Sequence, residues 1–510
     1  MTRLPPPAST RPGLPGGPYL IVGIGRAGRA AAGAIADHAG PSQVRAWDAS
    51  LELEARRSRS ELAALGIEVQ LGGDGLPLLE GSATVVKSPG VPPDAPLIAA
   101  ARARGLEVLD ELELGWRLTD VPVFAVTGTN GKSTSSELVV SALAAAGRRP
   151  VLAGNTKYGP PLSTAPTDGG CVVAEVSSYQ AEGCLRFLPD ASLFTNLTRD
   201  HMDRHGSMAV YGAAKRRLFV RGARAVSVAV INGDDAFGRR LAGAVQRRGG
   251  EVTTYGFGPT NTYRIHSVDS QLTGSSLAID TPDGRLRVRT RLNGRHNAMN
   301  VAGALALARA LGVPEDVGTE ALATAAPLPG RFEPVSCDEP FDVFVDFAHS
   351  PDAVEKTLVT ARTLASRRRA RVIVVFGNVA QGERRTFREI GRAARAGADR
   401  LVLCASSWGG EPGLVALQAV LEGARAVYGG SLEIVLDRRQ AIARGLEHAA
   451  DGDIVLILGR GSETRMAHDR RDGIISFDDR EVARELLGAR PRSVRSEPDL
   501  SREPVMIGSA

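Results

Sequence analysis

The sequence predicts a multidomain α/β protein built on parallel sheets. Short apolar runs alternate with helical stretches along most of the chain, and several of these runs end in glycine-rich turns. Alternating strands and helices are typical of parallel sheets that are covered by helices. The length of 510 residues corresponds to about three or four domains, at roughly 100–200 residues each.

Composition narrows the class of protein. A hydrophobic content of 43% and a charged content of 23% are typical of water-soluble globular proteins. The net charge of +5 is small and forms no basic block, which argues against nucleic-acid binding. No apolar run reaches the roughly 18–20 residues that span a bilayer. No secretory signal peptide is visible, and we expect a cytoplasmic monomer.

The two ends of the chain and its cysteines carry simple predictions. Residues 1–17 are rich in proline, and residues 490–510 mix proline, serine and charge, so we expect both to be disordered tails. The cysteines share no metal-binding spacing, and we expect them to be reduced thiols. They are Cys171, Cys184, Cys337 and Cys404.

The first folded segment, 18–119, opens with the pattern of a Rossmann-like domain. The apolar run YLIV leads into G-x-G-x-x-G at Gly23, Gly25 and Gly28, and a second strand, VRAWD, ends at Asp48, twenty residues after Gly28. This pattern is typical of a nucleotide or nucleotide-sugar bound at a helix N-terminus, with the acid at the ribose. Farther on, a strand ends in the turn 88–90, for which a plain turn is the simpler interpretation.

The segment VFAVTGTNGKSTSSE (123–137) predicts a phosphate-binding loop. An apolar strand runs into the spacing G-x-x-G-K-S, which is shorter than the usual G-x-x-x-x-G-K-[ST]. The glycines let backbone N–H groups approach phosphate oxygens, the lysine supplies a charge for the β/γ-phosphates, and a hydroxyl can ligate Mg²⁺. An ordinary glycine-rich turn is the alternative. We interpret the loop as an ATP site made of Gly128, Thr129, Asn130, Gly131, Lys132, Ser133 and Thr134.

Acidic and histidine side chains follow later strands of this central domain, 120–327. Glu175 stands alone in the apolar run CVVAEV, where burial is costly without a partner such as a metal or a lysine. A surface carboxylate is the alternative. LFTNLT predicts a strand followed by His201 and Asp203, at the sheet edge where ligands bind, although both could equally be local caps. The alternating pattern of 251–291 predicts a small antiparallel sheet.

The last segment, 328–489, predicts a second Rossmann-like domain. FDVFVDFAHSPDAVEKTL (341–358) reads as a strand, a loop with Asp346, His349 and Ser350, and a helix. The same order of strand, polar or glycine-rich loop and helix recurs along the rest of the segment. The loops of such a sheet lie along one edge, which is where a ligand is expected.

Taken in order, several long motifs resemble those of the ATP-dependent Mur ligases of peptidoglycan synthesis. They are TGTNGKST, AGN at 153–155, EVSSYQ, TNLTRDHMDRHGS, YGAAK and GRHNAMN. The resemblance covers nearly the whole chain apart from its two tails. It implies three domains: a Rossmann-like UDP-sugar domain, a central P-loop ATPase domain and a Rossmann-like C-terminal domain that reads the incoming amino acid.

Two branches of this family compete. IVGIGRAG, VVKSPGVP and SSYQ resemble the branch that adds D-glutamate to UDP-N-acetylmuramoyl-L-alanine (UDP-MurNAc-L-Ala). DFAHSPDAVEKTL, VVFGN, GRGSE and ISFDDREVA resemble the branch that adds a diamino acid, but its Asp-Asn-Pro-Arg motif is absent and CASSWGGEP stands in that region. The loop GNVAQGERR lacks the lysine typical of the D-glutamate branch. We expect D-glutamate addition, and the alternative is diamino-acid addition to UDP-MurNAc-L-Ala-D-Glu.

The implied reaction is ATP-dependent amide formation through an acyl phosphate, with UDP-MurNAc-L-Ala and D-glutamate as substrates. Folylpolyglutamate synthase shares the central ATPase, but the predicted UDP-binding domain argues against it. A non-catalytic nucleotide-binding scaffold is a further alternative. The joint presence of the implied catalytic residues argues against a scaffold; they are Lys132, Glu175, His201 and Lys215. A dehydrogenase would rest on GIGRAG alone.

The resemblance also implies roles for single residues. Lys215 matches a lysine that is carbamylated in many members, and His201 matches a residue close to a second Mg²⁺. The implied Mg²⁺ ligands are Ser133, Thr134, Glu175 and His201. Contacts to adenine, phosphate and ribose are implied, respectively, for Asn300, Arg331 and Asp346. Because the last two lie in the third domain, closure of that domain would complete the ATP site.

Two further sets of residues are implied for the other substrates. The UDP-sugar and its peptide would meet Gly25, Arg26, Ala27, Asp48, Ser88, Pro89, Gly90, Asn155, Ser177 and Ser178. The incoming amino acid would meet His349, Ser350, Arg460 and Ser462.

Overall fold

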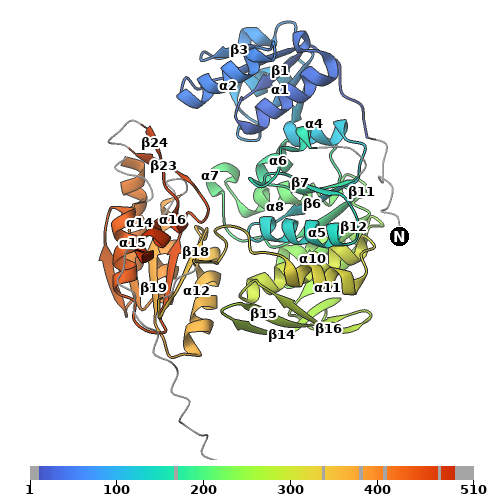
Figure 1. The fold of residues 1–510 in the computed structure, drawn as a ribbon. Coiled ribbons are helices and arrows are strands. Elements are labelled where there is room, and N and C mark those ends of the chain that lie inside the picture. Colours follow the sequence, from blue (N-terminus) through green and yellow to red (C-terminus); the bar gives the residue numbers. More distant parts are fainter. Residues whose placement is uncertain are drawn as a thin grey trace, which may run out of the picture. The chain divides into compact units, whose positions relative to one another are not determined.

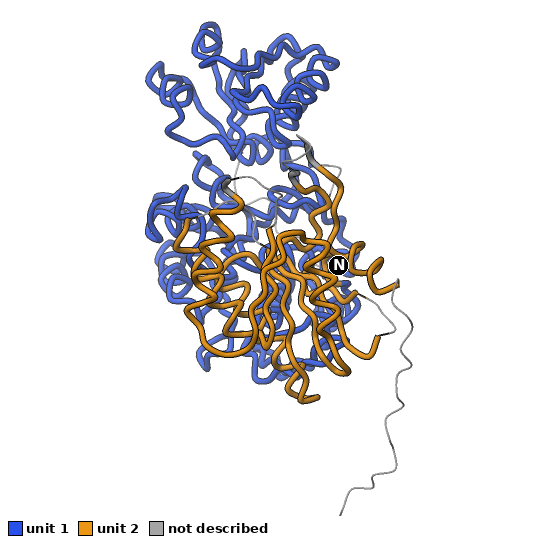
Figure 2. Tube along the Cα trace, turned by 90° about the vertical axis from the view of Figure 1, so that its left-hand side faces the viewer, with its two compact units in different colours: residues 1–326 blue, residues 327–510 orange. Residues whose placement is uncertain are grey.

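The computed structural model describes residues 11–165, 170–335, 339–377, 383–405, 411–468 and 473–488. These residues form two compact units, 1–326 and 327–510, which Figure 2 colours separately. The predicted α/β class with parallel sheets is confirmed. Residues 1–10, Cys337 and the predicted tail 490–510 lie outside the described residues. Among the helices that are described, none is long and apolar enough to cross a bilayer.

The first unit begins with a five-stranded parallel sheet in the order β3-β2-β1-β4-β5, a doubly wound arrangement (Figure 1). Its strands are β1 (Tyr19–Val22), β2 (Val44–Asp48), β3 (Glu68–Leu71), β4 (Thr84–Lys87) and β5 (Glu107–Asp110). Its helices are α1 (Arg26–Ala39), α2 (Leu53–Ala64), α3 (Pro96–Ala103) and α4 (Glu111–Leu118), with short 3₁₀ turns η1 (Pro41–Gln43) and η2 (Leu76–Leu79). Alternate residues of β1 point to opposite faces: Ile21 enters one apolar core and Leu20 the other. A Cβ at Gly28 would lie 1.8 Å from the carbonyl oxygen of Gly23, so only glycine lets α1 pack this close.

The same unit continues into a nine-stranded sheet in the order β16-β15-β14-β13-β12-β9-β6-β8-β7. Its strands are β6 (Val123–Thr127), β7 (Pro150–Gly154), β8 (Cys171–Glu175), β9 (Ala191–Phe194), β12 (Val228–Asn232), β13 (Glu251–Gly256), β14 (Tyr263–Gln271), β15 (Gly274–Thr281) and β16 (Gly284–Thr290). The antiparallel ladder β14–β15–β16 is present as predicted, but it extends this sheet through parallel pairing of β13 with β14. The predicted antiparallel strands thus form one end of the nine-stranded sheet.

Helices cover both faces of the nine-stranded sheet. They are α5 (Lys132–Ala145), α6 (Ser178–Gly183), α7 (Met202–His205), α8 (Met208–Arg216), α9 (Ala236–Gln246), α10 (Arg295–Ala310) and α11 (Glu315–Thr324), with η3 (Leu162–Thr164) and the hairpin β10 (Val220–Arg221) and β11 (Arg224–Ala225). Phe124 and Val126 enter the core beneath α5 and α10, whereas Val123 and Ala125 enter the opposite core. Burial on both faces explains why β6 is apolar without alternation.

The second unit holds a six-stranded sheet in the order β17-β18-β22-β19-β20-β21, in which only β17 is antiparallel to its neighbour. Its strands are β17 (Glu333–Val335), β18 (Asp342–Asp346), β19 (Val372–Phe376), β20 (Arg400–Leu403), β21 (Ser431–Ile434) and β22 (Ile454–Leu458), and β23 (Arg465–His468) and β24 (Gly473–Ser476) form a hairpin. Its helices are α12 (Pro351–Ser366), α13 (Arg384–Gly397), α14 (Glu411–Arg425), α15 (Arg438–Glu447) and α16 (Asp479–Gly488). Residues 378–382 and 406–410, within the two loops by which sequence analysis compared the family's branches, lie outside the described residues.

The part of the predicted N-terminal tail that the structure describes is held against the first unit. Arg11 donates to the carbonyl oxygens of Thr119 and Val121 and pairs with Asp190 at 3.3 Å. The carbonyl of Gly16 accepts from the Thr84 hydroxyl at 2.8 Å. Our expectation of a disordered tail is thus wrong for residues 11–17, because a single arginine in a proline-rich stretch finds specific acceptors.

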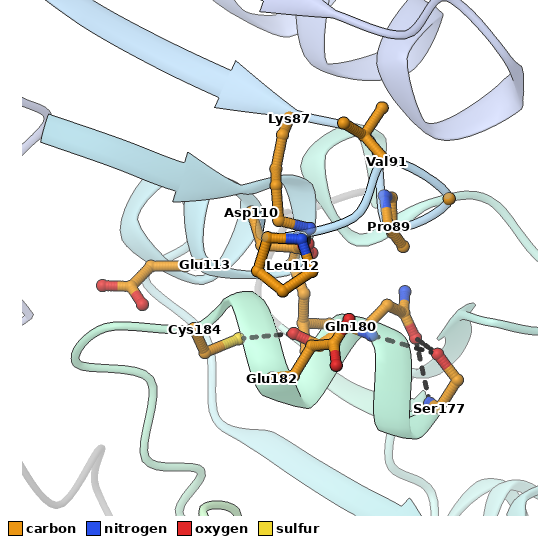
Figure 3. A network of polar contacts seen from close by, with 12 residues as sticks. Lys87, Pro89, Val91, Asp110, Leu112, Glu113, Ser177, Gln180, Glu182 and Cys184 are labelled. Carbon is orange, nitrogen blue, oxygen red and sulfur yellow. Dashed lines mark hydrogen bonds and ion pairs between the residues drawn. The ribbon is translucent and has the colours of Figure 1, made fainter. Parts of the chain in front are cut away.

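The first sheet meets the central domain through a buried polar junction (Figure 3). Lys87, at the end of β4, pairs with Asp110, at the end of β5, with 2.9 Å between Nζ and Oδ2. Both side chains are fully buried. A Cβ at Gly183 of α6 would lie 2.6 Å from Asp110 Oδ2, so the pair is packed directly against the central domain.

A second buried carboxyl at this junction makes stability depend on pH. Glu111 accepts from the Ser163 backbone N–H at 2.8 Å through Oε1, while Oε2 is buried without a hydrogen-bond partner. Burial raises the pKa of Glu111 from 4.5 to about 7. The folded state therefore favours protonated Glu111. The contribution of this carboxyl to the free energy of unfolding is lost as pH rises from 4.5 through about 7.

We predict that Glu111→Gln raises the free energy of unfolding at pH 8, because the amide keeps an acceptor for Ser163 without a charge. The pKa difference corresponds to a gain of about 3 kcal/mol at most, and the gain should shrink toward pH 5. Urea unfolding at both pH values measures it. Glu113→Gln is the control: its carboxylate pairs with Arg117 at 2.7 Å, so that variant should lose stability at both pH values. Equal effects of Glu111→Gln at the two pH values would contradict the prediction.

Candidate functional site

The predicted phosphate loop joins β6 to α5, and its two glycines have a structural reason. Gly131 has φ +85°, a left-handed conformation that side chains with a Cβ avoid. A Cβ there would also lie 2.3 Å from Oδ1 of Asn300. At Gly128 a Cβ would lie 1.8 Å from Oγ1 of Thr195. The loop therefore packs so tightly on its neighbours that both positions require glycine.

The loop is fixed by the residues that follow β9. The N–H of Thr129 donates to the carbonyl of Asn196 at 2.8 Å, and the N–H of Asn130 donates to Oδ1 of Asn196 at 2.9 Å. The hydroxyl of Thr195 donates to the Asn130 carbonyl at 2.7 Å. These contacts hold the backbone in one conformation, which is what a preorganised phosphate site needs.

Two lysines meet at the first turn of this loop. Nζ of Lys132 donates to the carbonyl oxygens of Gly128 and Thr129, at 3.2 and 2.8 Å. Nζ of Lys215, which is fully buried on α8, donates to the same Gly128 carbonyl at 2.7 Å. Burial, helped by the charge of Lys132, holds the pKa of Lys215 well below its usual range. Lys215 is therefore not an exposed surface lysine.

Glu175 ends β8 and is 3% exposed, which excludes the surface-carboxylate alternative. Oε1 accepts from the Asn155 side-chain amide at 3.3 Å, whereas Oε2 is buried without a hydrogen-bond partner. A buried, unpartnered carboxylate oxygen beside a phosphate loop fits a bound cation. The described residues contain no group of three or more His, Cys, Asp or Glu side chains that could hold a metal alone. This fits Mg²⁺, which is usually held by one or two carboxylates with phosphate oxygens and water.

His201 follows the end of β9 and precedes α7. It is the N-terminal cap residue of α7 with a left-handed φ of +54°, but its side chain makes no capping hydrogen bond. Nδ1 lies 3.2 Å from the Tyr179 hydroxyl, and Nε2 lies 3.6 Å from Oδ2 of Asp200. Burial lowers the pKa of His201, so the neutral ring, the form that ligates metals, is favoured. Its role as a metal ligand stays a prediction.

The residues implied for the UDP-sugar line the edge of the first sheet, and several are engaged locally. Asp48 accepts from the backbone N–H groups of Ile24 and Ser50, at 2.8 and 2.9 Å, and so fixes the glycine-rich turn. Arg26 donates to the carbonyls of Thr156 and Gly159 in the central domain. Gly25 is the N-terminal cap of α1, and Ala27 lies in its first turn.

The central domain's share of this set is also partly structural. Ser177 caps α6 in a reciprocal capping box with Gln180. The hydroxyl of Ser178 is buried and lies 2.9 Å from Nε2 of His205. Asn155 is exposed, and its side-chain amide donates to Oε1 of Glu175 at 3.3 Å. Asn300 is buried and accepts from the Ser135 hydroxyl at 3.3 Å; its predicted adenine contact stays a prediction.

In the second unit, the residues predicted for ATP lie beside those predicted for the amino acid. Asp346 is buried and accepts from the N–H groups of Phe332 and Ala348, at 2.7 and 2.8 Å. The guanidinium of Arg331 lies 4.5 Å from the centre of the Phe347 ring. His349 packs edge-on to that ring, with 4.6 Å between ring centres, and Ser350 caps α12.

The carboxyl edge of the second unit's sheet is strongly charged. Arg460 is 3% exposed and donates to the carbonyls of Arg465 and Phe477, at 3.0 and 3.4 Å. Arg438 and Asp479 form a fully buried pair with contacts of 2.7 and 2.6 Å. A Cβ at Gly330 would lie 2.1 Å from the backbone nitrogen of Ser462, so these loops pack closely. Roles of Arg460 and Ser462 toward an amino acid stay predictions.

Sequence analysis missed several side chains that contact the phosphate loop or neighbouring residues and hold them in position. Thr195 and Asn196 hold the phosphate loop, and the TNLT motif was a signal for them because it follows a strand at the sheet's carboxyl edge. Tyr211, whose hydroxyl lies 3.1 Å from Oγ1 of Thr129, belongs to the YGAAK motif. Arg204 and Glu182 had no signal beyond their charge.

Comparison with known families supports the interpretation of both units. The Mur ligase middle domain matches residues 126–308, and the Mur ligase, glutamate ligase domain, matches residues 330–461.

Known proteins of this kind are similar over most of the chain. UDP-N-acetylmuramoyl-L-alanyl-D-glutamate--2,6-diaminopimelate ligase of Solibacter usitatus is 34% identical over 71% of this chain and 76% of its own length. The enzyme of the same name from Geobacillus thermodenitrificans is 32% identical over 76% of this chain and 83% of its own. Among solved structures, the UDP-N-acetylmuramate-alanine ligase MurC of Thermotoga maritima has a TM-score of 0.57 at 20% identity, covering 87% of this chain and 95% of its own, which shows a shared fold.

These relatives correct one expectation. We expected a ligase that adds D-glutamate to UDP-MurNAc-L-Ala, but curated relatives that are 30–34% identical are named as ligases of 2,6-diaminopimelate. The short glycine motifs of the first domain misled the choice of branch, because they report nucleotide binding in general. The match of both domains and the extent of the similarity show that the chain belongs to the Mur ligase family, whose members are ATP-dependent ligases of peptidoglycan precursors.

Proposed function

We propose that the protein adds a diamino acid to UDP-MurNAc-L-Ala-D-Glu in an ATP-dependent reaction. The observation that carries this proposal is the similarity to ligases of 2,6-diaminopimelate at 30–34% identity over about three quarters of the chain. The motifs DFAHSPDAVEKTL and GRGSE of the second unit agree with that choice. The absent Asp-Asn-Pro-Arg motif leaves the identity of the diamino acid to the experiment below.

The first chemical step transfers the γ-phosphoryl group of ATP to the acceptor carboxylate. A carboxylate oxygen attacks the γ-phosphorus, the bond to the bridging oxygen breaks, and ADP and an acyl phosphate result. The phosphate loop would hold the phosphates, and Lys132 would neutralise charge that develops at the β/γ-bridge. Mg²⁺, held by Glu175 with a hydroxyl of Ser133 or Thr134, would supply further charge neutralisation when bound.

In the second step the amine of the incoming amino acid attacks the acyl carbon, and the tetrahedral intermediate expels phosphate. The contacts proposed for His349, Ser350, Arg460 and Ser462 would orient that amino acid. Arg331 and Asp346 of the second unit would contact the phosphate and ribose of ATP. We retain carbamylation of Lys215 as part of the proposal, since its lowered pKa favours the neutral amine that can add CO₂.

Phosphate release in the presence of ATP and Mg²⁺ tests the function. UDP-MurNAc-L-Ala-D-Glu should support turnover with at least one of meso-diaminopimelate, L-lysine or ornithine, and UDP-MurNAc-L-Ala with D-glutamate should not. Mass spectrometry of the product identifies the amino acid that is added. Turnover with D-glutamate alone would overturn the proposal, and no turnover with any acceptor would favour a non-catalytic scaffold.

A further inference from the structure

Arg204 of α7 donates hydrogen bonds to the turn 88–91, which belongs to the first sheet's domain. Its Nη1 donates to the carbonyl of Gly90 at 3.3 Å, and its Nη2 donates to the carbonyls of Pro89 and Val91, at 3.4 and 3.1 Å. This turn follows β4 at the carboxyl edge of the sheet, where a nucleotide-sugar is predicted to bind. One side chain of the central domain thus contacts three consecutive backbone carbonyls of the first sheet's domain.

The guanidinium is held in one orientation. Its Nε and Nη2 donate to Oε1 of Glu182, at 2.9 and 2.5 Å, and its carbon lies 4.9 Å from the centre of the Tyr179 ring. The side chain is 13% exposed. A planar fork with fixed donor directions can satisfy a carboxylate on one edge and carbonyls on the other, which a lysine cannot do. Figure 3 draws Glu182 together with Pro89 and Val91 of the turn.

Two further contacts connect Arg204 and Glu182 with residues near the phosphate loop. The Tyr179 hydroxyl, beneath the guanidinium, lies 3.2 Å from Nδ1 of His201. On the other side, Oε2 of Glu182 lies 3.6 Å from Nδ1 of His205, whose ring stacks on Tyr211 with 5.1 Å between centres.

This series of contacts, which starts at Arg204 and Glu182, ends at the phosphate loop. Tyr211 ends the series, because its hydroxyl lies 3.1 Å from Oγ1 of Thr129. All of these residues belong to the first compact unit, so the path is built within one body.

We propose that Arg204 is a positioning residue that sets the Ser88–Val91 turn, and with it the UDP-sugar acceptor, relative to the phosphate loop and His201. The inference rests on the proposed function for its substrate. It explains why a polar, largely buried guanidinium is directed at carbonyl oxygens of another domain. Loss of the guanidinium should loosen the turn but leave the backbone of the phosphate loop in place, because Thr195 and Asn196 hold that backbone directly.

Steady-state kinetics of Arg204→Lys test the effect on substrates. We expect the KM for the UDP-MurNAc acceptor to rise about tenfold, the equivalent of about 1.4 kcal/mol, while the KM for ATP changes less than about twofold. Arg217→Lys is the matched control, because the exposed Arg217 donates to the backbone carbonyl of the same Glu182 instead of to the turn. Equal rises of both KM values in Arg204→Lys, or values like those of the control, would overturn the proposal.

Hydrogen exchange of the ligand-free protein separates this inference from the proposed function. The N–H of Val91 donates to the Ser88 carbonyl at 3.0 Å and reports on the turn directly. We expect Arg204→Lys to speed its exchange about tenfold, with the N–H of Thr129 unchanged. If the protein turns over no UDP-MurNAc peptide, this result still stands, and only the substrate assignment fails. Unchanged exchange at Val91, or equal acceleration throughout the unit, would contradict the positioning role.

Discussion

Lys132→Met should lower kcat by about 10²–10³-fold, the cost typical of removing one group that stabilises transition-state charge. In the structure Nζ of Lys132 lies over the loop's own carbonyls of Gly128 and Thr129, which places the charge within the phosphate cradle. Because the neighbouring Lys215 contacts the same Gly128 carbonyl, it cannot move into the vacated position without giving up its own bond. Methionine retains most of the side chain's length and apolar stem, so the fold should be preserved.

Phosphate release at saturating substrates measures this loss, with circular dichroism as a check of folding. Lys356→Met serves as control: Lys356 is also a lysine on a helix, but it pairs with Asp352 on the surface of α12. That variant should retain full activity. A Lys132→Met enzyme with more than about a tenth of the parent kcat would show that the loop's backbone suffices for charge neutralisation.

Lys87→Met should destabilise the first unit by about 3–5 kcal/mol, because it leaves the fully buried Asp110 without its partner. Burial already raises the pKa of Asp110, so the lone carboxylate is favoured to take up a proton rather than stay charged. The double variant Lys87→Met, Asp110→Asn removes both charges. The side chain at position 110 can still cap α4, because the amide oxygen can accept from the Leu112 N–H. The double variant should recover much of the lost stability.

Urea unfolding followed by tryptophan fluorescence measures these differences. Trp47 lies in β2, and the Trp116 ring packs edge-on against Phe187 of the central domain, so a Trp408→Phe background confines the signal to the first unit. Arg57→Met is the control in the same domain, since the exposed pair of Arg57 with Glu61 at 3.7 Å should contribute less than about 1 kcal/mol. Equal destabilisation by the single and double variants would mean that the lysine acts through packing alone.

The parts of the fold that could be predicted are those that depend on residues close together in the sequence. The glycine spacing around Gly128 and Gly131 requires a tight loop between a strand and a helix, and the structure has that loop. Glu175 was predictable as a buried acid because it interrupts an apolar run. These signals are local, so a sequence contains them in full.

The contacts between side chains far apart in the sequence were not predictable. Arg204 reaches residues more than a hundred positions away, and Lys87 is separated from Asp110 by a helix and a turn, so neither pairing leaves a periodic pattern. The choice of branch failed for a related reason. Motifs such as GIGRAG describe how a backbone approaches a nucleotide, and they do not indicate which amino acid is added.

The N-terminal segment that holds Arg11 has a mechanical consequence. The two domains of the first unit are joined covalently through residues 119–122, and a hinge there would need freely rotating peptide groups. Arg11 instead fastens two carbonyls of that linker and anchors them to Asp190. Arg11, which lies outside the described helices and strands, thus restrains two peptide groups of the linker between these domains.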